Sequence, residues 1–594
     1  MHLARLSIRN FRNIVSIDIP LSSNIVLLGE NRVGKSNLLF AIRLVLDLTL
    51  PDSMRQLKLS DFWDGCDLAA NPQIEVHLDF ADFDKDDMLV ALLTDFRIAA
   101  DPTVARLSYV YRKRAEVTGI PQSSEDCEFI IYGGSDEFRS VPNRVRRRIA
   151  LDMLDALRDA EGQLASWRHS PLRPLLEDAF ASVSRAELEG IANDLETATT
   201  KMESFPSVKA LEESLRDGIF DLAGRAHDLN ARLRFAPADP LRLVRSIAMF
   251  IDDGKRGLSE ASLGSANVAL IALKLAEFAW RRGKNERNYS LLCIEEPEAH
   301  LHPQLQRAVF DKLFKNLEPA QALIVTSHSP TLATIAPLRS IVTLRRMPNG
   351  LSKAYSLAAL PVTAEELDDI ERYLTATRSE LLFAKGVIFV EGDAEEALLP
   401  GFANALGFNL DQLGITVCNV AGVNFNPYVK LAGSLGLPFS VVTDWDPLDG
   451  IKAPLGKART IGIWDSYCEV VPEATQLTSE SRTWCDAADF DTFSKAWALR
   501  GIFLNDQTFE VAMAKTPSLR GALLDILDEQ GFGPTRSARI KAWRLGTPVD
   551  SVQLLAMISD IGKGRLSAKL ATKLPGLIPP DYIAAAIKHV VSNV

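Results

Sequence analysis

Apolar and polar residues alternate near the start of the chain, and the pattern changes twice further along. Full or partial alternation predicts strands at 3–13, 73–80 and 105–111, and we expect these to pair antiparallel. From 145 to 232 the apolar residues recur at helical spacing instead, and after 382 strands and helices alternate again. The pattern therefore predicts an α/β protein with a helical segment inserted into its first half.

The helical segment spans 145–232. Its pattern predicts a helix through Ala150 to Leu157 and further helices at 188–202 and 211–229. Long amphipathic helices that leave a core often pair with another subunit, and packing back onto their own core is the alternative. A shorter acidic stretch at 359–377 has the composition of a helical linker.

A phosphate-binding loop follows the apolar run 24–28, because residues 29–36 fit G-x-x-x-x-G-K-[ST]. A helix is predicted directly after it, at 37–46, so the backbone amides of the loop can surround a triphosphate. Lys35 would reach the outer phosphates, and the Ser36 hydroxyl would be a ligand of Mg²⁺. The residues expected to bind ATP are Gly29, Asn31, Arg32, Gly34, Lys35, Ser36 and Asn37.

Two further apolar runs end in residues suited to nucleotide hydrolysis. The run 291–294 leads into Glu295-Glu296-Pro297-Glu298, and 322–326 leads into Ser327-His328. We expect Glu295 to hold Mg²⁺, Glu296 to polarise the attacking water and His328 to contact the γ-phosphate. His300 and His302 lie nearby without matching metal ligands, which favours structural roles.

A carboxylate group is predicted in the last third of the chain. A strand at 387–390 ends in Glu391-Gly392, and a second at 439–443 ends in Asp444-Trp445-Asp446. The ends of parallel strands lie at one edge of a sheet, so these acids would converge. Clustered carboxylates suit Mg²⁺ or Mn²⁺, and two such ions can cleave a phosphodiester. For a lone D-x-D, the end of a strand followed by a helix cap would be the better interpretation.

Length, charge and composition limit the number of domains, the way nucleic acid can bind and the cellular compartment. A length of 594 residues implies about two to four domains. The net charge of −11 leaves nucleic-acid binding to local basic segments, of which 535–573 and 139–148 are the candidates. The six cysteines are scattered, the N-terminus lacks a signal-peptide pattern, and no apolar run approaches the ~18 residues of a membrane span. We expect a cytoplasmic protein.

Taken together, the nucleotide motifs in residues 1–358 resemble the ABC-type ATPases of the RecF and SMC group. In that group a signature segment contacts the ATP of the opposite subunit. The best candidate here is 258–267, which departs from the usual L-S-G-G-Q. The departure bears on ATP hydrolysis and gating more than on ATP binding.

The remainder, 382–594, resembles a Toprim domain, and the joined chain is similar to the OLD (overcoming lysogenization defect) family of ATPase–Toprim nucleases, including its class 2 and Gabija members. The supporting motifs are 378–385, Val390-Glu391-Gly392, Val420-Ala421-Gly422 and Thr443-Asp444-Trp445-Asp446. The resemblance implies a catalytic site with two divalent metals. Its residues would be Glu391 and Glu395 for one metal, Asp444 and Asp446 for the other, Glu510 as an additional carboxylate, and Lys563 to stabilise the cleaved phosphate.

On this basis we expect five consecutive segments along the chain. They are the N-terminal segment of the ATPase (1–144), a helical dimerisation insertion (145–232), the C-terminal segment of the ATPase (233–358), a linker (359–381) and the Toprim domain with a helical C-terminal region (382–594). The resemblance further implies ATP-controlled cleavage of DNA, a homodimer or higher oligomer, a role in defence against phage, and a helicase-like protein as one candidate partner.

Alternative functions remain open from the residues alone. A topoisomerase would need a nucleophilic tyrosine, and Tyr428, Tyr467 and Tyr582 have no recognisable setting. No zinc-binding cysteine pattern supports a primase. An ATP-gated DNA-binding or sensor protein without cleavage is the alternative from another class, and RNA is an alternative substrate.

Overall fold

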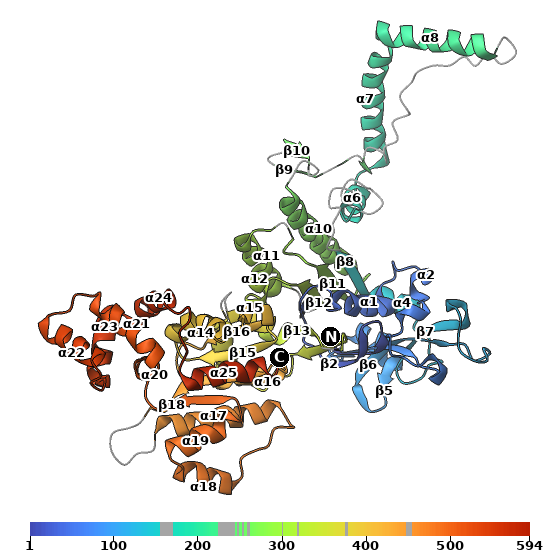
Figure 1. Ribbon diagram of the computed structural model, residues 1–594. Coiled ribbons are helices and arrows are strands. Elements are labelled where there is room, and N and C mark those ends of the chain that lie inside the picture. The colour runs from blue at the N-terminus through green and yellow to red at the C-terminus, as the bar shows by residue number, and fades with distance from the viewer. Residues whose placement is uncertain are drawn as a thin grey trace. The chain divides into compact units, whose positions relative to one another are not determined.

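The computed structural model describes most of the chain, and Figure 1 shows its elements. The described residues are 1–154, 170–223, 244–245, 247, 249–251, 255–257, 262–284, 286–299, 301–317, 320–347, 349–374, 378–446 and 454–594. They form two compact units. The main unit comprises Met1–Leu154, Tyr289–Glu298 and His302–Val594, and the helical unit comprises Asp155–Asn288 and Ala299–Leu301.

An antiparallel sheet begins the main unit. Its strands are β1 (His2–Phe11), β2 (Ile14–Pro20), β4 (Ile74–Ala81), β5 (Arg97–Ile98), β6 (Asp101–Lys113) and β7 (Cys127–Gly133). They follow the order β2-β1-β4-β6-β5, with β7 also paired to β6. Alternate residues such as Leu6, Ile8 and Val76 face a common core, which explains the period of two in the sequence. The three strands expected here are confirmed.

A second sheet carries the nucleotide motifs. It consists of β3 (Ile25–Leu28), β8 (Ile149–Leu154), β11 (Tyr289–Glu295), β12 (Gln321–Ser327), β13 (Ile341–Arg346) and β14 (Ser352–Ser356). The order is β14-β13-β3-β12-β11-β8, and only β14 is antiparallel to its neighbour. Helix α1 (Lys35–Leu46) buries its apolar residues in one core with both sheets. The phosphate-binding loop is thereby anchored between a buried strand and a buried helix.

Strand β8 corrects one prediction. The sequence pattern predicted a helix from Ala150 to Leu157, but Ile149–Leu154 is a strand, and the rest of that stretch lies outside the described residues. β8 pairs in parallel with β11, with Ala150 opposite Ser290 and Leu154 opposite Ile294. A short apolar run is compatible with either structure, and here the backbone pairing at the sheet edge decides.

The helical unit contains the long helices expected within 145–232. Its elements are α6 (Leu172–Ala181), α7 (Arg185–Glu203), α8 (Pro206–Ala223), β9 (Phe250–Ile251), β10 (Arg256–Gly257) and α10 (Leu263–Gly283). The prediction of helix is confirmed for 188–202 and 211–223, and residues 224–232 lie outside the described residues. Asp178 joins α6 to α10 by accepting from Trp280 Nε1 at 2.7 Å and pairing with Lys284 Nζ at 2.6 Å.

A four-stranded parallel sheet forms the centre of the C-terminal region of the main unit. Its strands β15 (Gly386–Val390), β16 (Ile415–Asn419), β17 (Phe439–Asp444) and β18 (Ile502–Asn505) follow the order β16-β15-β17-β18. β15 and β17 are adjacent and parallel, so the predicted convergence of their ends is confirmed. The helices that follow these strands are α14 (Asp393–Ala405), α16 (Asn426–Ser434), α17 (Leu455–Val470) and α20 (Phe509–Lys515).

The remaining helices complete the main unit. They are α2 (Asp52–Arg55), α3 (Asp87–Leu93), α4 (Asn143–Arg148), α11 (Pro303–Asn316), α12 (Pro330–Ala333), α13 (Ala364–Tyr373), α15 (Leu410–Leu413), α18 (Ser479–Ala487), α19 (Phe490–Ala498), α21 (Pro517–Asp528), α22 (Pro534–Arg544), α23 (Ser551–Ile561), α24 (Lys563–Ala571) and α25 (Asp581–Val591). The helix expected in the linker corresponds to α13. Among the described helices, none combines the length and apolar character needed to cross a membrane. All six cysteines lie in described segments and are free thiols.

Candidate nucleotide and metal sites

The phosphate-binding loop depends on two glycines with positive φ. Gly29 has φ +156° and Gly34 has φ +105°. A Cβ atom on Gly29 would lie 2.6 Å from the Leu344 carbonyl oxygen, and one on Gly34 would lie 2.6 Å from Asn13 Nδ2. Both positions therefore require glycine, for backbone conformation and for space.

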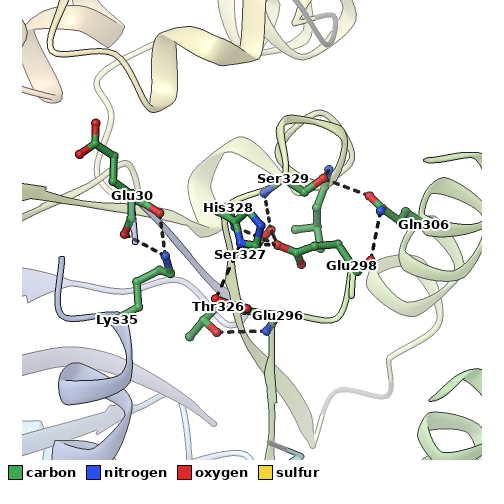
Figure 2. A network of polar contacts seen from close by, with 11 residues as sticks. Glu30, Lys35, Glu296, Glu298, Gln306, Thr326, Ser327, His328 and Ser329 are labelled. Carbon is green, nitrogen blue, oxygen red and sulfur yellow. Dashed lines mark hydrogen bonds and ion pairs between the residues drawn. The ribbon is translucent and has the colours of Figure 1, made fainter. Parts of the chain in front are cut away.

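Lys35 points back at the loop that precedes it (Figure 2). Its buried Nζ donates to the carbonyl oxygens of Gly29 at 2.7 Å and Glu30 at 3.1 Å. Burial lowers the pKa of Lys35, while the nearby charges of Glu296, Glu298 and Glu295 act in the opposite direction. The ammonium group is thus held close to the loop, on the same side as the acids that follow β11.

The other loop residues divide into exposed and supporting ones. Asn31, Arg32 and Ser36 are exposed. Asn37 instead donates from Nδ2 to Asn13 Oδ1 at 2.7 Å and accepts from Arg12 Nη1 at 2.8 Å. The sequence did not predict that Arg12 and Asn13 support the loop. Their contacts with Asn37 depend on how the chain packs, and no motif marks them.

Glu298 organises the turn that carries His328 (Figure 2). Its buried Oε1 accepts from Ser327 Oγ at 2.7 Å and from the His328 backbone amide at 2.9 Å. The ring nitrogen Nδ1 of His328 lies 3.3 Å from the same oxygen and 3.7 Å from Glu296 Oε1. Glu298 thus fixes the histidine beside Glu296, a role that the motif alone did not reveal.

Glu295, Glu296 and His328 lie at the ends of two adjacent parallel strands, as expected. The Glu296 backbone has φ +42°, and its amide donates to the Thr326 carbonyl at 2.9 Å. His302 caps α11 by accepting from the Leu305 amide at 3.3 Å, which confirms a structural role. His300 and signature residues 258–261 lie outside the described residues, while Ser262 caps α10.

At the end of β15, Glu391 lies beside the end of β17. Glu391 Oε1 accepts from Thr443 Oγ1 at 2.5 Å and from the Asp444 amide at 3.1 Å. Asp444 Oδ1 in turn accepts from Asn505 Nδ2 at 2.5 Å, at the end of β18. The predicted residues Glu391 and Asp444 are therefore brought together by three neighbouring strands.

Arg459 of α17 lies among these carboxylates. Its Nη1 donates to Glu391 Oε1 at 2.9 Å and to Thr443 Oγ1 at 2.7 Å, and its Nη2 donates to Asp446 Oδ2 at 2.5 Å. The side chain is only 11% exposed. Sequence reasoning missed this residue, because an arginine in a helix has no motif that marks it as a partner of distant acids.

Glu395 and Glu510 lie close enough to Asp444 to act on its charge. Burial, followed by the charges of Glu391, Glu395, Asp446 and Glu510, raises the pKa of Asp444 to about 9. Burial also raises the pKa of Glu395 to about 7. Lys563 Nζ pairs with Glu510 Oε1 at 2.8 Å. Burial lowers the pKa of Lys563, but this pair and the charges of Glu395 and Asp444 together raise it above its usual value.

These residues have the donor chemistry of a divalent-cation site. Glu510 is 2% exposed, and its Oε2 is buried without a hydrogen-bond partner. Crowded carboxylates with raised pKa values need compensating positive charge. Within the described residues, no group of three such ligands is already arranged around one point. The guanidinium of Arg459 and the ammonium of Lys563 provide positive charge instead.

The segments 535–573 and 139–148 were the candidates for binding nucleic acid, and neither is the open basic surface that this role would suggest. In 535–573, acids pair with most of the basic side chains: Arg536 with Asp560, Arg544 with Asp525, Lys563 with Glu510, and Lys569 and Lys573 with Glu529. In 139–148, Arg146 is half-buried on α4, and burial lowers its pKa. Neither segment is therefore a continuous surface of unpaired cations.

Three family models match stretches of the chain. The overcoming lysogenization defect protein-like TOPRIM domain matches 382–446, the AAA ATPase domain matches 144–333, and a family described only as a protein of unknown function matches 1–120. The first of these includes Glu391, Asp444 and Asp446, and the second includes Glu295, Glu296 and His328. The strand-end residues of both candidate sites thus fall within matched regions, whereas Arg459, Glu510 and Lys563 lie outside them.

Relatives extend the similarity over most of the chain. An OLD nuclease of Thermus scotoductus is 26% identical over 75% of this chain and 83% of its own length. Endonuclease GajA of Bacillus cereus is 22% identical over 78% of each chain. The solved C-terminal region of the Burkholderia pseudomallei OLD protein is 32% identical over 36% of this chain and 98% of its own, with a TM-score of 0.30. The chain belongs to the overcoming lysogenization defect family, in which an ATPase is joined to a Toprim domain.

Proposed function

We propose that the protein is a metal-dependent DNA endonuclease whose cleavage is controlled by its ATPase domain. The observation that carries the proposal is the meeting of Glu391 and Asp444 at the ends of adjacent parallel strands, with Asp446 joined to them through Arg459. Relatives named OLD nuclease and endonuclease GajA support the reaction class.

The metal ligands would be Glu391 and Glu395 on one side and Asp444 and Asp446 on the other, with Glu510 contributing a further oxygen. Two divalent cations held there would supply activation of a water and stabilisation of the leaving oxygen. Two observations support this assignment: Glu510 Oε2 is buried without a hydrogen-bond partner, and burial together with four neighbouring carboxylates raises the pKa of Asp444.

Two cationic residues would complete the site. Lys563 lies 2.8 Å from Glu510, and we expect its ammonium group to contact a phosphate oxygen of the substrate. Arg459 holds Glu391 and Asp446 in place by hydrogen bonds. We expect Arg459 to give up some of these contacts when cations bind, since the guanidinium and a cation compete for the same oxygens.

The nucleotide site would control access to the nuclease site. ATP would bind the loop 29–36 with Mg²⁺ on Ser36 and Glu295, Glu296 would polarise water, and His328 would contact the γ-phosphate. We further propose a homodimer or higher oligomer formed through the helical unit, and a role in defence against phage. A helicase-like partner belongs to the same proposal.

The test is cleavage of supercoiled plasmid DNA with Mg²⁺ or Mn²⁺, with and without ATP. We expect the wild type to nick or linearise the plasmid and Glu391→Ala to leave it intact. The matched control is Glu480→Ala, because Glu480 is an exposed acid on α18 outside the site. Loss of cleavage in Glu391→Ala but not in Glu480→Ala would locate the reaction.

A second candidate is an ATP-gated DNA-binding protein without cleavage. The position of Arg459 favours it, because a guanidinium that neutralises Glu391 and Asp446 could replace metal permanently. In that case plasmid, linear and single-stranded DNA would all stay intact under every metal and nucleotide condition, while DNA binding would persist in Glu391→Ala. This outcome would refute the nuclease proposal.

A further inference from the structure

A cavity of about 700 Å³ in the main unit lies between the phosphate-binding loop and the Toprim sheet. Gly29 and Glu30 of the loop form one wall, and Arg345 and Arg346 at the end of β13 form another. Lys385, directly before β15, contributes from the Toprim side. The cavity thus contacts the loop that would bind ATP and the segment that leads into β15, the strand followed by Glu391.

Arg345 is the unusual residue of this cavity. Its Nε and Nη2 are buried and have no hydrogen-bond partner among the described residues. No described carboxylate lies within ion-pair distance of it, and burial lowers its pKa to about 10, which still leaves the guanidinium charged at neutral pH. A buried charged group without a partner destabilises a fold unless a ligand or water satisfies it.

Tyr355, which lines the cavity, lies beside two cations, of which Lys353 is not itself on the wall. Arg345 Cζ lies 5.6 Å from the centre of the Tyr355 ring, and Lys353 Nζ lies 5.0 Å from the same ring. The exposed side chains of Arg346 and Lys385 have no acidic partner among the residues that the structure describes. Among the described lining residues, Arg345, Arg346 and Lys385 supply three positive charges against Glu30 and the terminal carboxylate of Val594, so positive charge predominates.

The size and chemistry of the cavity indicate the ligand class. Guanidinium and ammonium groups bind phosphate oxygens, and an aromatic ring offers a surface on which a base can stack. The volume of about 700 Å³ lies within the range of small-molecule sites, about 300–1,000 Å³. An inorganic anion alone would leave the aromatic and apolar wall, which includes Tyr355 and Phe383, without contact.

We propose that this cavity binds an organic phosphate of nucleotide size, with the phosphate on Arg345 and Lys385 and the base against Tyr355. The cavity shares Gly29 and Glu30 with the phosphate-binding loop, but Lys35 is not among its lining residues. A ligand here would contact Gly29 and Lys385 at once, and so it would couple the nucleotide loop to the strand that carries Glu391. Only this coupling rests on the proposed nuclease function; the binding itself does not.

The experiment is calorimetric titration of the full chain with AMP, ADP, pyrophosphate and inorganic phosphate. Lys35→Ala removes the lysine of the phosphate-binding loop, and we expect this variant to retain one site for ADP or AMP. Adding Arg345→Gln should weaken that site by about tenfold or more, as expected for loss of a charge-assisted contact. Arg307→Gln, on the exposed face of α11, is the control and should change nothing.

Three outcomes would overturn the proposal. The first is a Lys35→Ala variant that binds none of the four probes. The second is pyrophosphate binding as tightly as ADP, which would exclude a contribution from the aromatic wall. The third is unchanged ADP binding in Arg345→Gln; if that variant does not fold, unchanged binding in Lys385→Gln decides equally, because Lys385 is exposed. Titrating Glu391→Ala with ADP separates binding from cleavage, since this variant should bind normally.

Discussion

Arg459 donates to Glu391 at 2.9 Å, so the glutamate that ends the first Toprim strand is held by a cation from a helix that follows the third. The same guanidinium reaches Asp446 at 2.5 Å. One side chain therefore joins the acids of two strands. This arrangement allows the carboxylates to stay close together before any metal binds.

Arg459→Ala should lower the melting temperature in EDTA and increase the stabilisation that Mn²⁺ provides. Removing the cation leaves crowded carboxylates, at a cost of about 2 kcal/mol, less than for a fully buried pair because Glu391 stays 21% exposed. Mn²⁺ would then bind without displacing a guanidinium. The measurement is thermal unfolding of wild type and variant with and without Mn²⁺. Equal Mn²⁺ shifts in both proteins would mean that Arg459 and the metal do not compete.

Lys563→Ala should reduce cleavage by at least about 100-fold. The variant lacks the positive charge that would stabilise the negative charge developing on the phosphate during cleavage. It also leaves the 2% exposed Glu510 without its ion partner, so some of the effect could come from stability. The double variant Lys563→Ala/Glu510→Gln removes both charges and should restore the melting temperature but not cleavage. Restoration of cleavage as well would show that Lys563 serves only to neutralise Glu510.

Glu298→Ala should lower kcat for ATP hydrolysis by about tenfold with KM changed by less than about twofold. The reason is positional: without Glu298, Ser327 Oγ and the His328 amide lose their acceptor and His328 is no longer held beside Glu296. Glu298→Gln keeps one acceptor oxygen and should be milder. The check is steady-state ATPase kinetics of both variants, and a rise in KM with normal kcat would contradict the positioning role.

Sequence reasoning placed the residues at strand ends but missed residues that a helix and a turn bring to each site, and the reason is physical. Strand ends of a parallel sheet meet at one edge, so the strand pattern alone was enough to place Glu391 and Asp444 together. Arg459 and Glu298 could not be assigned, because their partners are set by how a helix and a turn pack. Lys563 was placed only through the family resemblance, and its pairing with Glu510 depends on the packing of α20 and α24.

The incorrect prediction of a helix from Ala150 to Leu157 has a similar origin. Its apolar residues satisfy helical spacing and also form a continuous run, and the local sequence does not decide between the two. The free edge of the sheet beside β11 decides, since pairing there satisfies the backbone groups of Ile149–Leu154. The long helices α7 and α8 were easier to predict, because their pattern persists over several turns.

Lys35→Ala should abolish the effect of ATP on cleavage while leaving cleavage without ATP within about twofold of wild type. Lys35 is buried in the loop and makes no contact with the Toprim carboxylates, so its loss should act on the nucleotide alone. The comparison is plasmid cleavage across an ATP titration for both proteins. The same ATP response in both would show that the loop 29–36 is not the controlling nucleotide site.

The helical unit exposes apolar side chains on two of its helices. Ile191 and Leu195 on α7, and Leu211 and Leu215 on α8, are 56%, 41%, 54% and 45% exposed, and each pair is four residues apart on one helix face. Such apolar stripes are unfavourable in water unless a partner covers them, and a second copy of this chain is the proposed partner. Leu211→Glu/Leu215→Glu should therefore reduce the mass measured by light scattering to that of a monomer. Glu212→Gln/Glu213→Gln on the same helix is the control, and a wild-type protein that is already monomeric would exclude this interface.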